Sequence, residues 1–354
     1  MYSPEFIQKL GDSLQSVTQF PSRTFQSLVM DADWEARELK DRSKHIARCL
    51  RHGLSGDYPK QIEQLYAISE GYSGFTAIVF SDFVELFGLP YWELSMQAMH
   101  RFTQLCTAEF AVRPFFIQDY QAMVKQHLVW SKDQNHHVRR LASEGIRPRL
   151  PWGMGVPLLK KEPQVIFPIL ANLVEDESEY VRRSVANNLN DISKDHPDLV
   201  LRFVKSLDLK NQNTRKLVKH ALRGLLKQAH PEALALFGFG DALSVNLKDF
   251  FLENDKVEKG GDLLWGAKLE IKGKGALRLE YHVHYCKANG TRSKKVFQIS
   301  EQHIEAQRDL LIQKKQSFRD LTTRVHYPGI HRIELVANGK SIAGKEFELL
   351  TSPR

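Results

Sequence analysis

The residues best suited to chemistry gather in one irregular segment, residues 142–153. It carries the carboxylate of Glu144, the guanidinium groups of Arg147 and Arg149 and the indole of Trp152, broken up by a glycine and two prolines. A carboxylate can stabilise a developing positive charge or orient a water, and an aromatic face attracts cations. Guanidinium groups bind phosphate. The alternative is a structural kink in which Trp152 fills the core, and the sequence leaves both interpretations open.

Several other kinds of chemistry are not indicated. The chain contains no P-loop, no GxGxxG after a strand, no GxSxG and no HExxH. Its three cysteines are far apart, so we expect neither a disulfide framework nor a CxxC metal site, and a reducing cytoplasm is the natural location. Two histidine pairs, His136–His137 and His282/His284, have no acidic or cysteine cluster beside them in the sequence, so we expect no metal site.

A repeated motif surrounds the irregular segment. Val138-Arg139-Arg140 matches Val181-Arg182-Arg183 at an offset of 43 residues, and a weaker copy follows about 33 residues later. Helical units at such spacing are typical of a HEAT-like α-solenoid, whose units bury their apolar faces on one another. The arginine pairs would then line a concave surface with positive charge. The alternative is that they are ordinary solvent contacts.

The elements that must position these residues fall into two groups. Residues 1–237 are predicted to be helical, with an apolar stripe from Trp92 to Cys106 and a core role for Trp130. From about residue 238 the pattern changes to strands: residues 277–285 alternate strictly, and Asn289-Gly290 marks a hairpin turn before residues 295–299. A second strand pair, residues 333–336 and 346–349, flanks Asn338-Gly339. We therefore predict a mainly α protein, a HEAT-like α-solenoid followed by a small all-β immunoglobulin-like sandwich at residues 238–354.

Charge is unevenly distributed along the 354 residues. The net charge is +8, yet residues 131–230 alone carry 18 basic and 11 acidic side chains. Such a positive field would concentrate a polyanion on one part of the molecule. A solvated basic face that serves solubility is the alternative. No apolar run approaches the roughly 18 residues of a membrane span.

Three stretches together resemble a known family. Residues 109–115, 138–152 and 181–194 are similar to the alkylpurine DNA glycosylases of the HEAT-like repeat DNA alkylation repair family. The resemblance extends into an immunoglobulin-like C-terminal domain, which some members of that branch carry, and it is weakest over residues 1–85.

The resemblance implies an enzyme that hydrolyses the N-glycosidic bond of cationic N3-alkylated bases in duplex DNA. Those bases are above all 3-methyladenine, and then 3-methylcytosine. The reaction would leave an abasic site without flipping the base, and without metal, nucleotide or redox cofactor. It places the catalytic residues at Glu109, Glu144, Asp191 and Trp152. DNA contacts are expected from the basic residues of the same motifs: Arg113, Arg139, Arg140, Arg147, Arg149, Arg182, Arg183 and Lys194.

Each acidic residue also has a structural explanation. Asp191 could bridge to Lys194, Glu144 could pair with Arg140 four residues earlier, and Glu109 could be an ordinary helix-end acid.

The expected partner is double-stranded DNA containing alkylated bases, bound by a monomer in the bacterial cytoplasm with no membrane association. The C-terminal domain would clamp DNA through the basic hairpin around Asn289. Two rival functions remain, a noncatalytic scaffold that binds DNA or protein and a lesion sensor that does not cut.

Overall fold

The computed structural model describes residues 1–351 apart from residues 241 and 323. Its chain forms two compact units, Met1–Ala221 and Leu222–Arg354. The predicted domain boundary after residue 237 stays a prediction. Helices run as far as Leu236 and the first strand begins at Leu243, so the expected change from helices to strands near residue 240 is confirmed. Among the described residues no helix is both long enough and apolar enough to span a bilayer.

The first unit is entirely helical. Its α-helices are α1 (Pro4–Val17), α2 (Ser22–Val29), α3 (Leu39–Gly53), α4 (Tyr58–Ser69), α5 (Ile78–Phe87), α6 (Trp92–Phe102), α7 (Val112–Gln118), α8 (Tyr120–Trp130), α9 (His136–Glu144), α10 (Pro157–Lys161), α11 (Phe167–Ala171), α12 (Glu179–Ile192), α13 (Pro197–Lys205) and α14 (Gln212–Ala221). Short 3₁₀ helices lie at η1 (Trp34–Ala36), η2 (Phe75–Ala77) and η3 (Pro163–Ile166).

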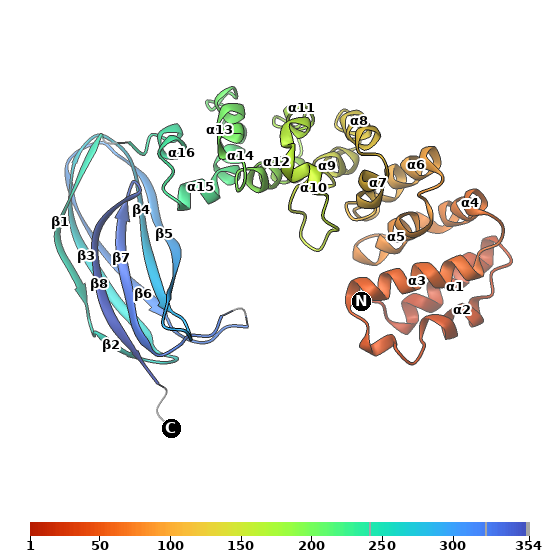
Figure 1. The fold of residues 1–354 in the computed structure, drawn as a ribbon, viewed down its shortest axis with the longest axis horizontal. Helices are drawn as coiled ribbons and strands as arrows, with labels where there is room; N and C mark the ends of the chain where they lie inside the picture. The colour runs from red at the N-terminus through yellow and green to blue at the C-terminus, as the bar shows by residue number, and fades with distance from the viewer. Residues whose placement is uncertain (241, 323, 352–354) are drawn as a thin grey trace. The chain divides into compact units, whose positions relative to one another are not determined.

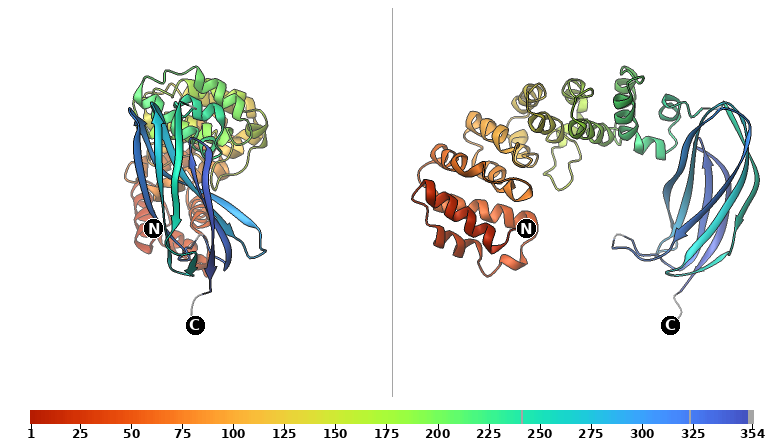
Figure 2. Two further views of the ribbon diagram at one scale, coloured as in Figure 1. Left: turned by 90° about the vertical axis from the view of Figure 1, so that its left-hand side faces the viewer. Right: turned by 180° about the vertical axis from the view of Figure 1, so that it is seen from behind.

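These helices pack side by side in succession (Figures 1 and 2). Helix α9 packs between α8 and α12, and α12 packs on α14. The predicted apolar stripe is core, since Met96, Met99 and Phe102 are buried in α6, although the helix ends at Phe102 and leaves Cys106 beyond it. Trp130 is 3% exposed, which confirms its predicted place in the core.

The two clear copies of the repeated motif fold alike where they begin. Arg139 donates from Nη1 to the carbonyls of Asp133 and Gln134, at 3.0 and 2.7 Å. Arg182, 43 residues later, donates in the same way to the carbonyls of Asp176 and Glu177, at 2.5 and 2.8 Å. The first arginine of each pair therefore closes the turn that precedes its helix.

The second unit begins with two short helices and continues as strands. The helices are α15 (Arg223–Lys227) and α16 (Pro231–Leu236). The strands are β1 (Leu243–Leu252), β2 (Lys256–Glu258), β3 (Asp262–Gly273), β4 (Gly275–Cys286), β5 (Arg292–Ile304), β6 (Arg308–Ser317), β7 (Gly329–Ala337) and β8 (Lys340–Leu350).

The strands form two sheets, ordered β1-β3-β6 and β2-β8-β7-β4-β5. Alternate residues of β3 and β4, from Leu263 to Ile271 and from Leu277 to Tyr285, face a shared apolar core. Both predicted hairpins are present, as β4–β5 around Asn289-Gly290 and β7–β8 around Asn338-Gly339. The named strands pair antiparallel except at one edge, where β2 pairs in parallel with β8.

Candidate functional site

Residues 142–144 of the irregular segment complete α9, and the rest of it belongs to a loop of residues 145–156 between α9 and α10 (Figure 1). Its first half is buried and its second half is mostly exposed. One buried side chain holds it: Arg113 donates from Nε to the carbonyl of Met154 at 2.8 Å. Its Nη1 donates to the carbonyls of Gly145 and Arg147, at 2.9 and 3.1 Å. Burial lowers the pKa of Arg113 to about 10.

Helix α9 ends at Glu144, and the next residue, Gly145, has no room for a side chain. A Cβ at this position would lie 2.8 Å from both the Nε2 of His127 and the Cγ2 of Val112. His127 is fully buried, its Nδ1 bonds the carbonyl of Met123 at 2.9 Å, and burial lowers its pKa to about 3. The neutral ring therefore packs directly against the loop.

The three acids singled out above are joined by arginines in one alternating network. Glu109 pairs with Arg140, whose other Nη is 3.5 Å from Glu144. Arg147 links Glu144, at 2.5 Å, to Asp191, at 2.8 Å. Ser184 donates to the second oxygen of Glu144 at 2.6 Å. The network thus ties the loop to α9 and α12, and the side chains of its three acids are at most 11% exposed.

Pairing keeps the buried guanidinium groups charged. Burial alone would lower the pKa of Arg140, but Glu144 and Glu109 more than offset it, so that pKa is raised. The pKa of Arg147 is raised in the same way, because Glu144 and Asp191 outweigh its burial. A network of paired charges avoids leaving any one charge buried and uncompensated.

A cavity of about 470 Å³ opens beside this network, which we call the site cavity. Glu109, Glu144, Arg140 and Arg147 line it, and the rest of its wall is mainly aromatic, apolar or sulfur-containing: Phe75, Leu105, Cys106, Phe110, His137, Pro151, Trp152 and Tyr180. The guanidinium of Arg140 lies 5.1 Å from the centre of the Tyr180 ring. Asp191 does not line the cavity and reaches it only through Arg147. The cavity can therefore offer carboxylates and ring faces to a cation.

Trp152 stands on the exposed half of the loop. It is 78% exposed, which rules out the alternative in which it fills the core. Its φ of +60° is rare for a residue with a side chain and costs roughly 1–2 kcal/mol. Lys40 of α3 donates to its carbonyl at 2.9 Å and lies 3.8 Å from the centre of the Phe110 ring. A strained, exposed tryptophan held in place at a cavity mouth is typical of a functional site.

Both structural contacts expected for the acids are present, Asp191 to Lys194 at 3.2 Å and Glu144 to Arg140 at 3.5 Å. Glu109 lies between α6 and α7. These contacts belong to the same network, so they do not separate a structural from a chemical role.

The residues expected to contact DNA divide by exposure. Arg183, Lys194 and Arg149 have side chains 67%, 49% and 38% exposed. Arg139, Arg140 and Arg147 are paired with acids and at most 14% exposed, and Arg182 is engaged with turn carbonyls. Arg113 is 1% exposed, so the expected contact with DNA is corrected at this residue to a role in holding the loop.

A second cavity, of about 500 Å³, lies along α12 and α14. Arg182, Arg183, Lys216 and His220 line it together with Glu179 and Asn213. It is lined by residues of the second and third copies of the motif.

Sequence reasoning missed Phe110 and Tyr180, which line the site cavity, and Lys40, which contacts the lining residues Phe110 and Trp152. The repeat held a signal for one of them, because Tyr180 is the counterpart of His137 at the 43-residue offset and both line the cavity. Lys40 had no such signal, since it lies 112 residues before the carbonyl that it contacts.

Comparison with known proteins gives consistent results over the whole chain. Residues 106–225 match the family described as DNA alkylation repair enzyme, and residues 246–351 match the C-terminal Ig-like domain of YhaZ. An uncharacterised protein of Bacillus subtilis, YhaZ, is 40% identical over 350 residues, which are 99% of this chain and 98% of that protein. The structure of Pseudomonas fluorescens alkylpurine DNA glycosylase AlkC, bound to DNA containing an abasic site analogue, is 34% identical. It matches with a TM-score of 0.94 over 99% of this chain and 98% of that one.

Proposed function

The chain belongs to the DNA alkylation repair enzyme family, in the branch of alkylpurine DNA glycosylase AlkC, and from this premise we propose that it excises alkylated bases from DNA. The observation that carries the proposal is the arginine-linked set of three carboxylates beside an aromatic cavity. The substrates are cationic N3-alkylated bases, 3-methyladenine first and 3-methylcytosine second, in duplex DNA, and the product is an abasic site.

The chemistry of the substrate explains why these residue types suffice. An N3-alkylated base already carries a positive charge, so it leaves without a general acid to protonate it. The barrier then lies in the positive charge that develops on the deoxyribose, which a nearby carboxylate stabilises. At an effective dielectric constant of about 20, a charge pair on the order of 6 Å apart gains roughly 3 kcal/mol, or about 100-fold in rate.

The contacts of Arg140 support the proposal that the cavity suits a planar cation. Its guanidinium is planar and charged, and it occupies the space between the Tyr180 ring and Glu109. A cationic base or sugar has the same needs, a ring face on one side and a carboxylate on the other. Trp152, exposed on its loop, would supply a second ring face. We propose that the base is not flipped, so that lesion and site meet at the duplex surface.

The surrounding basic side chains would hold the phosphates. Arg149, Arg183 and Lys194 are the most exposed of the candidates, and each lies on or next to an element that carries the network. Phosphate contacts position the duplex without reading its sequence. We propose that Arg182 joins them from the second cavity.

We further propose that the helical unit is a HEAT-like repeat array and that the β unit clamps DNA. The equivalent turn contacts of Arg139 and Arg182 support the first point. The exposed hairpin that carries Lys287 and Lys295 supports the second. The protein would act as a monomer.

The site assignment is tested by Glu144→Gln and Asp191→Asn. Each variant keeps the shape of the side chain and removes its charge, and we expect both to abolish excision while DNA binding remains. Asp176→Asn is the matched control, because Asp176 forms a buried bidentate pair with Arg139 but is not one of the three carboxylates that Arg140 and Arg147 join in the network. Excision retained in both test variants would refute the assignment. If the control loses excision to the same extent, the losses in the test variants reflect lower stability and not the loss of a catalytic carboxylate.

A further inference from the structure

A histidine–carboxylate cluster lies in the β unit, away from the residues of the proposed excision site. Strand β4 turns its odd-numbered residues, such as Tyr281 and Val283, into the core, so His282 and His284 share the opposite face of the sheet. Glu334 on β7 stands directly opposite His282 in the strand register. Three potential metal ligands are therefore placed together by two central, antiparallel strands.

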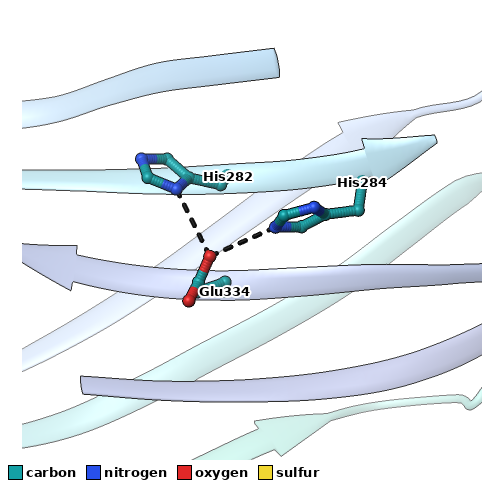
Figure 3. Close-up of side chains that lie close together, drawn as sticks. All are labelled: His282, His284 and Glu334. Atoms are coloured by element: carbon teal, nitrogen blue, oxygen red, sulfur yellow. Dashed lines mark hydrogen bonds and ion pairs between the residues drawn. The ribbon is translucent and has the colours of Figure 1, made fainter. Parts of the chain in front are cut away.

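The distances within the cluster suit one shared ion. The Oε2 of Glu334 lies 3.3 Å from the Nδ1 of His282 and 3.1 Å from the Nε2 of His284 (Figure 3). One ligand atom from each residue lies within 4.8 Å of the other two. The remaining oxygen of Glu334 accepts a hydrogen bond from Ser341 at 2.5 Å, which fixes the orientation of the carboxylate.

The burial of the three side chains supports the same interpretation. The side chains of His282, Glu334 and His284 are 10%, 17% and 25% exposed. The nitrogen and oxygen atoms that face one another are therefore partly shielded from water, which would otherwise compete for an ion.

We propose that His282, His284 and Glu334 form a binding site for a divalent transition-metal ion of the zinc class. Two imidazole nitrogens and one carboxylate oxygen are a common ligand set for Zn²⁺, with water completing the coordination. Mg²⁺ and Ca²⁺ prefer sets made of oxygen atoms. The site is independent of the proposed excision chemistry and would tie β4 to β7.

Some charged residues near the cluster favour a bound cation and others oppose it. Glu280, two residues before His282 on β4, adds negative charge and is itself paired with Arg278. Lys294 on β5 and Arg332 on β7 both stand opposite His284 and oppose a bound cation. The proposal therefore predicts that Lys294→Ala tightens metal binding.

Sequence reasoning expected no metal here because no acidic or cysteine cluster lies beside the histidine pair in the sequence. Glu334 lies 50 residues beyond His284 and joins it only through the pairing of β4 with β7.

The test uses the full-length, untagged chain after treatment with EDTA and dialysis. Co²⁺ is titrated as a visible-absorption probe, and bound Zn²⁺ is counted by elemental analysis after equilibrium dialysis. We expect one equivalent per chain, at least a tenfold loss of affinity in His284→Ala and Glu334→Gln, and tighter binding in Lys294→Ala. His303→Ala is the control, because His303 is an exposed histidine of the same unit, 3.4 Å from Glu305.

Two results would overturn the proposal. One is a wild-type chain that binds no more Zn²⁺ than His284→Ala, in which case the three residues form a hydrogen-bonded cluster without a metal. The other is affinity that depends on His303 as strongly as on His284, which indicates adventitious surface binding. His284 and Glu334 have side chains 25% and 17% exposed, so their variants test the site without a change at the more deeply buried His282.

Discussion

Replacing Arg113 by methionine should release the loop that carries Trp152. The three hydrogen bonds of Arg113 come from a charged donor, and such bonds contribute about 2 kcal/mol each. Against this stands the cost of burying the cation, since no ion pair joins Arg113 to a carboxylate among the described residues. Burial lowers its pKa from the ordinary value to about 10, which corresponds to about 3 kcal/mol. The net contribution of Arg113 is therefore about 3 kcal/mol.

Most of that loss should appear as local opening of residues 145–156. Hydrogen exchange measured by mass spectrometry on peptides from this loop should become about 100-fold faster in Arg113→Met, in keeping with about 3 kcal/mol. Excision should fall with it, because Trp152 and Arg147 lose their fixed positions. The matched control for exchange is Arg149→Met, in the same loop, whose exposed pair with Asp195 contributes at most about 1 kcal/mol. If Arg113→Met exchanges its loop amides at the wild-type rate and unfolds at the wild-type temperature, Arg113 does not hold the loop.

Three further results are expected. Gly145→Ala should destabilise the helical unit by about 1–3 kcal/mol in thermal unfolding, because its Cβ meets the buried His127 ring, and an unchanged melting temperature would contradict this close approach. Burial raises the pKa of Asp82 to about 7, which hydrogen bonding from Ser43 only partly offsets. Its contribution to stability is then complete below about pH 4 and is lost as the pH rises towards 7. Asp82→Asn should remove up to about 4 kcal/mol of that pH dependence, and a pH profile equal to the wild type would contradict it. Lys287→Ala should reduce the magnitude of the slope of log affinity for DNA against log salt concentration by about one. Lys274→Ala, on the loop between β3 and β4, is the control.

Periodic features were predictable because they repeat over short distances along the chain. The 43-residue offset placed Arg139 and Arg182 at equivalent positions in α9 and α12, where each donates to carbonyls of the preceding turn. Strict alternation placed residues 277–285 in a strand, but that strand is mostly buried on both faces rather than half-buried. Turn residues with positive φ, such as Asn338 and Gly339, marked the hairpins.

Contacts between distant segments left no such signal. Arg113 looked like a surface cation, yet it is buried under a loop more than thirty residues away. Glu334 reaches His284 only because β4 and β7 are neighbours in the sheet, although β5 and β6 separate them in the chain. Charged residues in these places depend on tertiary pairing, which local sequence patterns do not encode.

The most direct test of the central claim is release of 3-methyladenine from methylated duplex DNA by the full-length chain. The reaction is run in EDTA, so that the outcome does not depend on the proposed metal site. We expect free 3-methyladenine with a matching number of abasic sites, lost in Asp191→Asn and kept in Asp176→Asn. DNA that is bound but yields no free base would contradict the proposed activity, and undiminished release by Asp191→Asn would contradict the proposed site.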